Sequence, residues 1–122
     1  MPTVLAIDTA PWYGGAQASL LTLLKGLVSS GWSPRLLSAD PGPGGLLRRA
    51  EENGIPASHL PARHWPATPR GLLAFFTDRR RCRPDIREEL ADHAPDLLHA
   101  NGTRAAPLLI PAPRKHPPPP VV

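Results

Sequence analysis

The sequence predicts an α/β domain built on a parallel β-sheet with helices packed against it. Short apolar runs alternate along the chain with longer segments whose leucines recur at helical spacing, and glycines stand at the turns between them. Such alternation is typical of β-α-β units, which have right-handed crossovers and bind ligands outside the carboxyl ends of the strands. The 122 residues suffice for one hydrophobic core but not for two.

The first unit is a strand, a glycine turn and a helix. Residues 4–7 are uninterruptedly apolar, which suits a central strand buried on both faces. Gly14 and Gly15 then open the leucine-rich segment 16–28, and Gly31 supplies the stop signal expected after a helix. A glycine turn at a helix start lets the backbone approach a ligand closely, and its free N–H groups attract anions. This unit therefore predicts a phosphate-binding turn.

A second and weaker unit follows. Residues 34–38 read as a short strand, 40–45 as a proline- and glycine-rich loop, and 46–53 as a shorter helix with Gly54 as its cap. Residues 55–60 form a third strand that a proline already interrupts, so we expect it near an edge of the sheet.

The next segment is expected to be irregular at first and then helical. Three prolines punctuate residues 59–69, and two separate helices are predicted over 71–81 and 84–93, because Pro84 suits the first turn of a helix. Residues 96–100 read as another strand, which ends in a second strand-to-turn transition.

Several polar or glycine positions fall at the predicted carboxyl ends of the strands. They are Gly14, Gly15, Asp40 and residues 99–103. Because parallel strands end at the same edge, we expect one binding crevice there. Asp8 ends the first strand. Two roles are equally open to its side chain: it binds a substrate, or it caps the N–H groups of its own loop.

Composition separates the body of the chain from its end. Eighteen prolines are present, several of them in the last sixteen residues, so we divide the chain into a domain over 1–106 and a proline-rich tail over 107–122. Val121 and Val122 are candidates for the beginning of a further strand. Cys82 is the single cysteine, which excludes an intrachain disulfide and favours a cytoplasmic location.

The segments 14–17, 54–56 and 95–102 together resemble the amino-terminal, acceptor-side domain of family 4 glycosyltransferases. Their order and spacing fit, and the resemblance runs from about residue 3 to about residue 106. It implies one Rossmann-like half of a GT-B architecture, in which two such domains enclose a nucleotide sugar and an acceptor. The chain lacks the carboxyl-terminal domain, so we expect an incomplete and inactive half.

The resemblance also implies site residues. It places Gly14 and Gly15 near the donor diphosphate or the acceptor, where fixed N–H dipoles would stabilise the charge that grows on the departing diphosphate. His99 is the catalytic candidate, since an imidazole is the side chain best suited to proton transfer near neutral pH. Many relatives carry a second histidine where Asn101 stands, and an asparagine there is also suited to left-handed turn geometry. The remaining binding candidates are Asp8, Gln17, Asn101, Gly102 and Thr103.

The expected partners are a nucleotide-sugar donor and a sugar or lipid-linked acceptor, with no metal ion, cofactor or nucleic acid. A net charge of +4 is too small to indicate nucleic-acid binding by itself. Arginines at 79–81 and 83 are interpreted as a solvated helix end, and peripheral contact with anionic lipid is their functional alternative.

Two further functions stay open. A stand-alone dinucleotide-binding module is suggested by Asp40, which stands where a ribose-binding acid belongs, although residues 13–18 do not reproduce the G-x-G-x-x-G pattern. A truncated, non-catalytic interaction protein is the other, with a sheet edge or the proline tail meeting a partner.

Overall fold

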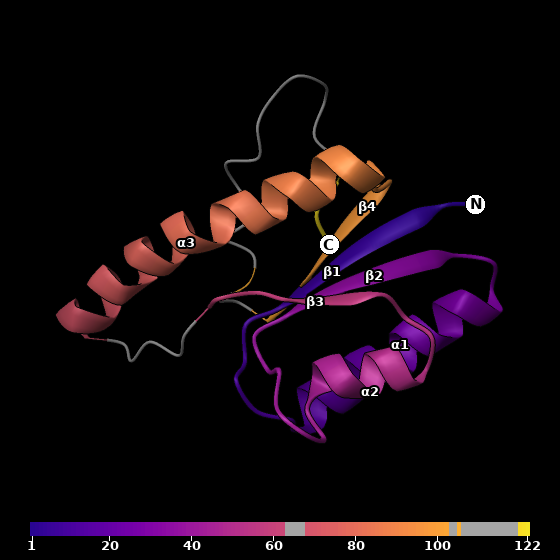
Figure 1. Cartoon of the computed structure of the whole chain (residues 1–122), viewed down its shortest axis with the longest axis horizontal. Helices are drawn as coiled ribbons and strands as arrows, with labels where there is room; N and C mark the ends of the chain where they lie inside the picture. Colours follow the sequence, from indigo (N-terminus) through magenta and orange to yellow (C-terminus); the bar gives the residue numbers. More distant parts are fainter. Residues whose placement is uncertain (63–67, 103–104, 106–119) are drawn as a thin grey trace.

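The computed structural model describes residues 1–62, 68–102, 105 and 120–122. One sheet lies between α3 on one side and α1 with α2 on the other (Figure 1). The elements, in chain order, are β1 (Thr3–Asp8), α1 (Gly15–Ser29), β2 (Ser33–Ser38), α2 (Leu46–Glu52), β3 (Ala57–His59), α3 (Pro69–His93) and β4 (Leu97–Asn101). This is an α/β, Rossmann-like arrangement, as the sequence predicts.

All strand pairs are parallel, and the strand order is β3-β2-β1-β4. The first strand is therefore internal and β3 lies at an edge, so both predicted positions are confirmed. The register pairs Asp8 with Ser38 on one side and with Asn101 on the other. Three strands thus end level with one another, which brings their last side chains to one edge.

The two faces of the sheet carry separate hydrophobic clusters because side chains alternate along each strand. Leu5 and Ile7 of β1 pack with Cys82 and Ile86 of α3. Ala6, between them, faces the opposite way and joins the cluster of α1 and α2. The α1 and α2 members of that cluster are Leu20, Leu24, Leu46 and Ala50. Burial on both faces explains the unbroken apolar run of β1.

The predicted helix over residues 16–28 is confirmed as α1, and the helix over 46–53 as α2. Gly31 and Gly54 follow the ends of these helices with φ of +87° and +74°. Backbone at such angles strains residues that have a Cβ atom, so glycine at these two positions ends each helix at low cost.

The two helices predicted over 71–81 and 84–93 are one continuous helix, α3, so Pro84 does not start a helix. The first turn instead begins at Pro69, and the hydroxyl of Thr68 accepts a hydrogen bond of 3.1 Å from the Gly71 N–H. Pro84 is exposed, so water can reach the Arg80 carbonyl that loses its usual N–H donor. The arginines at 79–83 consequently lie in the middle of a helix and not at its end.

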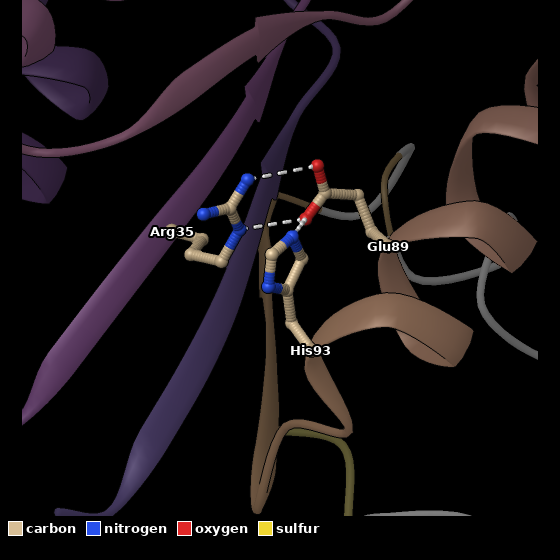
Figure 2. A network of polar contacts seen from close by, with 3 residues as sticks. All are labelled: Arg35, Glu89 and His93. Carbon is tan, nitrogen blue, oxygen red and sulfur yellow. Dashed lines mark hydrogen bonds and ion pairs between the residues drawn. The ribbon is translucent and has the colours of Figure 1, made fainter.

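An ion pair joins the carboxyl-terminal half of α3 to β2 (Figure 2). The Arg35 guanidinium donates to both carboxylate oxygens of Glu89, with Nε–Oε2 and Nη2–Oε1 distances of 2.8 and 3.2 Å. The His93 Nε2 atom lies 3.8 Å from Glu89 Oε2. A two-pronged contact of this kind fixes geometry as well as adding energy, so it orients α3 across the sheet.

The end of the chain returns to the sheet. Leu98 N–H donates to the Pro120 carbonyl at 2.9 Å, and Val122 N–H donates to the Leu98 carbonyl at 2.7 Å. Val121 forms a parallel bridge with Leu98, which confirms the expectation of a further strand at Val121 and Val122. Thr103, most of the tail 107–122 and residues 63–67 of the predicted irregular segment lie outside the described residues. Within the described part of the chain, no helix has the length and apolar character that crossing a membrane requires.

Candidate functional site

Asp8, the last residue of β1, is the centre of a polar network at the carboxyl edge of the sheet. Its side chain is almost completely buried. One carboxylate oxygen accepts a hydrogen bond of 2.9 Å from the Ala10 N–H. The other accepts from Gln17 Nε2 at 3.0 Å and from Asn101 Nδ2 at 2.5 Å. Of the two roles open to Asp8, capping its own loop is the one that these contacts support.

Gln17 connects this carboxylate to the start of α1. Its side chain is buried in the first turns of the helix, and its Oε1 atom accepts a hydrogen bond of 3.0 Å from the Gly14 N–H. Because the same amide donates to Asp8, the helix start is tied to the end of β1 through one side chain. The network therefore fixes the first turn of α1 relative to the sheet.

The glycines at this turn are permitted by the fold but are not required by it. Gly14, the residue before α1, has extended backbone angles that any residue adopts. A Cβ atom added to Gly14 would make ordinary contacts, and one added to Gly15 would meet nothing within 4 Å. Gly14 has no side chain that could accept from the N–H groups of the first turn, and no acidic residue stands in that turn. A Cβ atom at Gly15 would therefore find open space beside the first turn of α1.

Asn101 joins the network from β4, and it does so as a strand residue. Besides its bond to Asp8, its Nδ2 atom lies 3.4 Å from the Ala16 carbonyl oxygen of α1. The left-handed backbone angle belongs to the next residue, Gly102, with φ of +94°. Asn101 is therefore not explained by turn geometry. Thr103 lies outside the described residues.

His99 is close to this network in the fold but is not part of it. It pairs with Ala6 in the register of β1 and β4, two residues before Asn101. Alternation along the strand places its half-buried side chain on the face of the sheet that α1 covers, like Asp8 and Asn101. The structure thus brings Asp8, Gln17, Asn101 and Gly14 together, with His99 one step further from the edge.

Asp40 belongs to the loop between β2 and α2. Its Oδ1 atom accepts a hydrogen bond of 3.4 Å from the Gly42 N–H. A Cβ atom added to Gly45 would lie 2.5 Å from its Oδ2 atom, so the loop backbone packs directly against the carboxylate. These contacts support a role in shaping the loop and not in binding a ribose.

A contact that no sequence pattern predicts bridges the two loops at this edge. The Arg49 guanidinium lies 4.1 Å from the centre of the Tyr13 ring, and its Nε atom donates to the Gly44 carbonyl at 2.6 Å. Tyr13 also packs against the hydrophobic cluster of α1 and α2. No spacing signal links residues 13 and 49, because their proximity depends on the sheet register that places the two loops side by side.

Comparison with known proteins agrees with this geometry. Residues 14–122 match the model of a family described as the glycosyl transferase 4-like domain. A search of curated proteins found no match.

Several solved structures have a similar fold. A glycosyltransferase from Rickettsia africae superposes with a TM-score of 0.63 at 17% identity, over 98% of this chain and 28% of that one. Anabaena Alr3699/HepE, solved in complex with UDP and glucose, gives a TM-score of 0.56 at 19% identity, over 88% and 25%. A glycinamide ribonucleotide transformylase from Symbiobacterium toebii gives 0.55 at 19% identity, over 94% and 49%.

The chain thus spans between about a quarter and a half of the length of these structures. At such identities the likeness establishes a shared fold alone, and the transformylase shows that this fold supports more than one chemistry.

Proposed function

The chain belongs to the glycosyl transferase 4-like domain family, and on that premise we propose that it is the acceptor-side half of a glycosyltransferase that uses a nucleotide-sugar donor. The domain would comprise residues 1–106, and the tail 107–122 would lead back to the sheet at Val121. These 122 residues span 28% of the Rickettsia africae enzyme, so residues outside them would form the rest of the cleft. The chain by itself would not transfer sugar.

The observation that carries this proposal is the open start of α1. Gly15 leaves open space beside the first turn, and Gly14 presents no side chain to the N–H groups of that turn, although neither glycine is needed for the fold. In an enzyme that cleaves a nucleotide sugar, negative charge grows on the departing diphosphate. Preorganised N–H dipoles stabilise that charge without reorganising, and the contacts of Asp8, Gln17 and Asn101 hold these dipoles in place.

Substitution of Gly15 by Ala tests the proposal. A Cβ atom at this position meets no protein atom, so the free energy of unfolding should be unchanged or slightly raised. A phosphate approaching the same N–H groups would meet the new methyl group. We therefore expect UDP and UDP-glucose to raise the melting temperature of the original chain, and this shift to be largely lost in Gly15→Ala.

Gly26→Ala is the matched control for this experiment. Gly26 lies in the same helix, is exposed, and would accept a Cβ atom with nothing within 4 Å. It should stabilise the chain by about 0.5–1 kcal/mol and keep the full nucleotide-dependent shift. Equal shifts in both variants would refute a ligand at the start of α1.

His99, Gly102 and Thr103 complete the proposed site. His99 would move a proton or contact a sugar hydroxyl from the face of the sheet that α1 covers, and the strand-to-turn position of Gly102 would let a substrate approach the backbone. The complex of Anabaena HepE with UDP and glucose supports a nucleotide-sugar donor as the ligand class.

A lipid-linked acceptor, with peripheral membrane contact through α3, is the finer part of the proposal. Leu73, Phe76, Arg80, Arg83 and Arg87 follow one another at alternating spacings of three and four, so they share one helix face. Leu73 and Phe76 are 71% and 56% exposed. Cys82 and Ile86 of the same helix are buried against the sheet, and Arg83 between them is half-buried.

The amino-terminal half of α3 extends beyond the sheet (Figure 1). A helix face that carries exposed apolar side chains followed by exposed arginines would complement an anionic bilayer surface, where apolar groups enter and guanidinium groups meet phosphates.

Sedimentation with liposomes tests this contact. The chain should sediment with vesicles containing phosphatidylglycerol and stay in solution with phosphatidylcholine alone. Leu73→Ser should reduce sedimentation strongly without lowering stability, since this side chain is exposed. Sedimentation that does not depend on anionic lipid would contradict the proposal.

A further inference from the structure

Arg49 of α2 carries a guanidinium group that the fold holds in place above the loop between β1 and α1. Its Cζ atom lies over the Tyr13 ring, 4.1 Å from the ring centre. Its Nε atom donates to the Gly44 carbonyl at 2.6 Å. Arg49 is nevertheless exposed, and a long exposed side chain ordinarily samples many rotamers. Contacts from two different loops thus orient this side chain before a ligand arrives, which lowers the entropic cost of binding.

The positive charge of Arg49 is not neutralised by any carboxylate of the described residues. The ion pairs in that part of the chain join Glu89 to Arg35 and to His93. Asp40, in the loop before α2, is buried and its carboxylate is bound within that loop. The two Nη atoms of Arg49 make no hydrogen bond to a described residue either, since its hydrogen bond to the protein comes from Nε. Charge and donors are therefore available to an external anion.

This charge stands at the carboxyl edge of the sheet, beside the proposed diphosphate site. Tyr13, under the guanidinium, directly precedes Gly14, the residue before α1. Gly44 belongs to the loop that follows β2, and β1 and β2 end level with one another. Ligands of parallel α/β sheets bind at this edge. Arg49 is therefore placed where a ligand at the start of α1 extends toward the neighbouring loop.

From these contacts we propose that Arg49 binds a phosphate group of the substrate. The end of a guanidinium carries two parallel N–H groups, which match two oxygens of a phosphate. Tyr13 is a positioning residue, because its ring face holds the cation in place. The phosphate has two sources, the diphosphate of the donor and a phosphate monoester on the acceptor. This inference rests on the proposed function and adds a charged residue to the N–H groups of α1.

The experiment follows the Arg49 Nε–H signal of the ¹⁵N-labelled full chain by NMR at constant ionic strength. The loss of this signal in Arg49→Lys assigns it. The probes are inorganic phosphate, UDP and glucose 6-phosphate, and acetate is the control anion. At least one phosphate probe should shift the Arg49 signal saturably, and acetate at the same concentration should leave it in place. An equal response to acetate would overturn the proposal, because it would indicate a surface charge without selectivity.

Substitutions test the same residue through the backbone amide signal of Gly44. Arg49→Ala should weaken phosphate binding about tenfold, because charge-assisted hydrogen bonds are lost. Arg48→Ala is the matched control, since Arg48 is exposed in the same helix and carries the same charge. It should weaken binding less than about twofold. Arg49→Lys keeps the charge without the paired N–H groups and should recover only part of the affinity. Equal weakening by both alanine variants would overturn the proposal.

The arms separate the inference from the proposed function. If UDP shifts the Gly15 amide and no probe shifts Arg49, the arginine site is refuted while the diphosphate site stands. If inorganic phosphate or glucose 6-phosphate shifts Arg49 and UDP leaves Gly15 in place, the arginine site stands and the diphosphate site is refuted. Shifts of Arg49 and Gly15 together by UDP assign the phosphate to the donor. A shift of Arg49 by glucose 6-phosphate in the chain saturated with UDP assigns it to the acceptor.

Discussion

At the scale of single residues, Asp8 organises the site. Its carboxylate accepts hydrogen bonds from the loop after β1, from Gln17 of α1 and from Asn101 of β4. A buried carboxylate is stable only when such donors replace the water that it has lost. The residue that ends the central strand therefore determines where the helix start and the next strand end lie.

Asp8→Asn should destabilise the chain by about 1–3 kcal/mol, because an amide NH₂ group would face the side-chain donors of Gln17 or Asn101. Urea denaturation measures the free energy of unfolding. Asp96→Asn is the control, since Asp96 is exposed at the opposite edge and accepts from the Thr3 N–H at 2.8 Å. We expect a smaller loss there. Similar losses in both variants would contradict a central role for Asp8.

At the scale of elements, α3 differs most from its expected form. A proline inside a helix removes one hydrogen bond and crowds the preceding turn, so a break at Pro84 was the simplest expectation. Packing overrides it, because Cys82 and Ile86, on either side of Pro84, are both buried against the sheet. The bond of Glu89 to Arg35 then holds the last turns of the helix. Tertiary contacts thus outweigh the helix-breaking preference of Pro84, although the proline still lowers the stability of the helix.

Pro84→Ala should recover part of that cost and raise the free energy of unfolding by about 1–3 kcal/mol, because alanine restores the N–H donor for the Arg80 carbonyl. Pro41→Ala serves as the control. Pro41 is exposed in a loop outside any helix, so its replacement should leave stability unchanged or slightly lowered. A loss of stability in Pro84→Ala would mean that the proline ring itself packs favourably.

At the scale of the whole molecule, the candidate site lies at the carboxyl edge of the sheet, and in the proposed function it would form one half of a cleft. Asp8, Ser38 and Asn101 end their three strands level with one another. The chain also spans only 25% of the Anabaena protein solved with UDP and glucose.

We therefore expect no sugar transfer from UDP- or GDP-linked sugars by the chain alone. Addition of a separately expressed donor-side domain of a family member should restore transfer, and Gly15→Ala should reduce the restored rate. Release of labelled nucleotide from the donor measures both. Transfer by the chain alone would show that it needs no second half.

Sequence by itself determined the order of strands and helices, the ends of α1 and α2, the central place of β1 and the edge place of β3. These features follow from hydrophobic periodicity and from glycines at turns. Both signals depend only on residues that are close together in the sequence. The sequence also indicated Asp8, Gln17 and Asn101 as separate binding candidates, without showing that they contact one another.

Only the tertiary structure decided that these residues bind one another, since Asp8 and Asn101 are 93 positions apart and meet through the register of two parallel strands. The contact of Arg49 with Tyr13 and the continuity of α3 through Pro84 were decided in the same way. Contacts between distant segments depend on how the sheet is assembled, and local patterns along the chain do not encode that assembly.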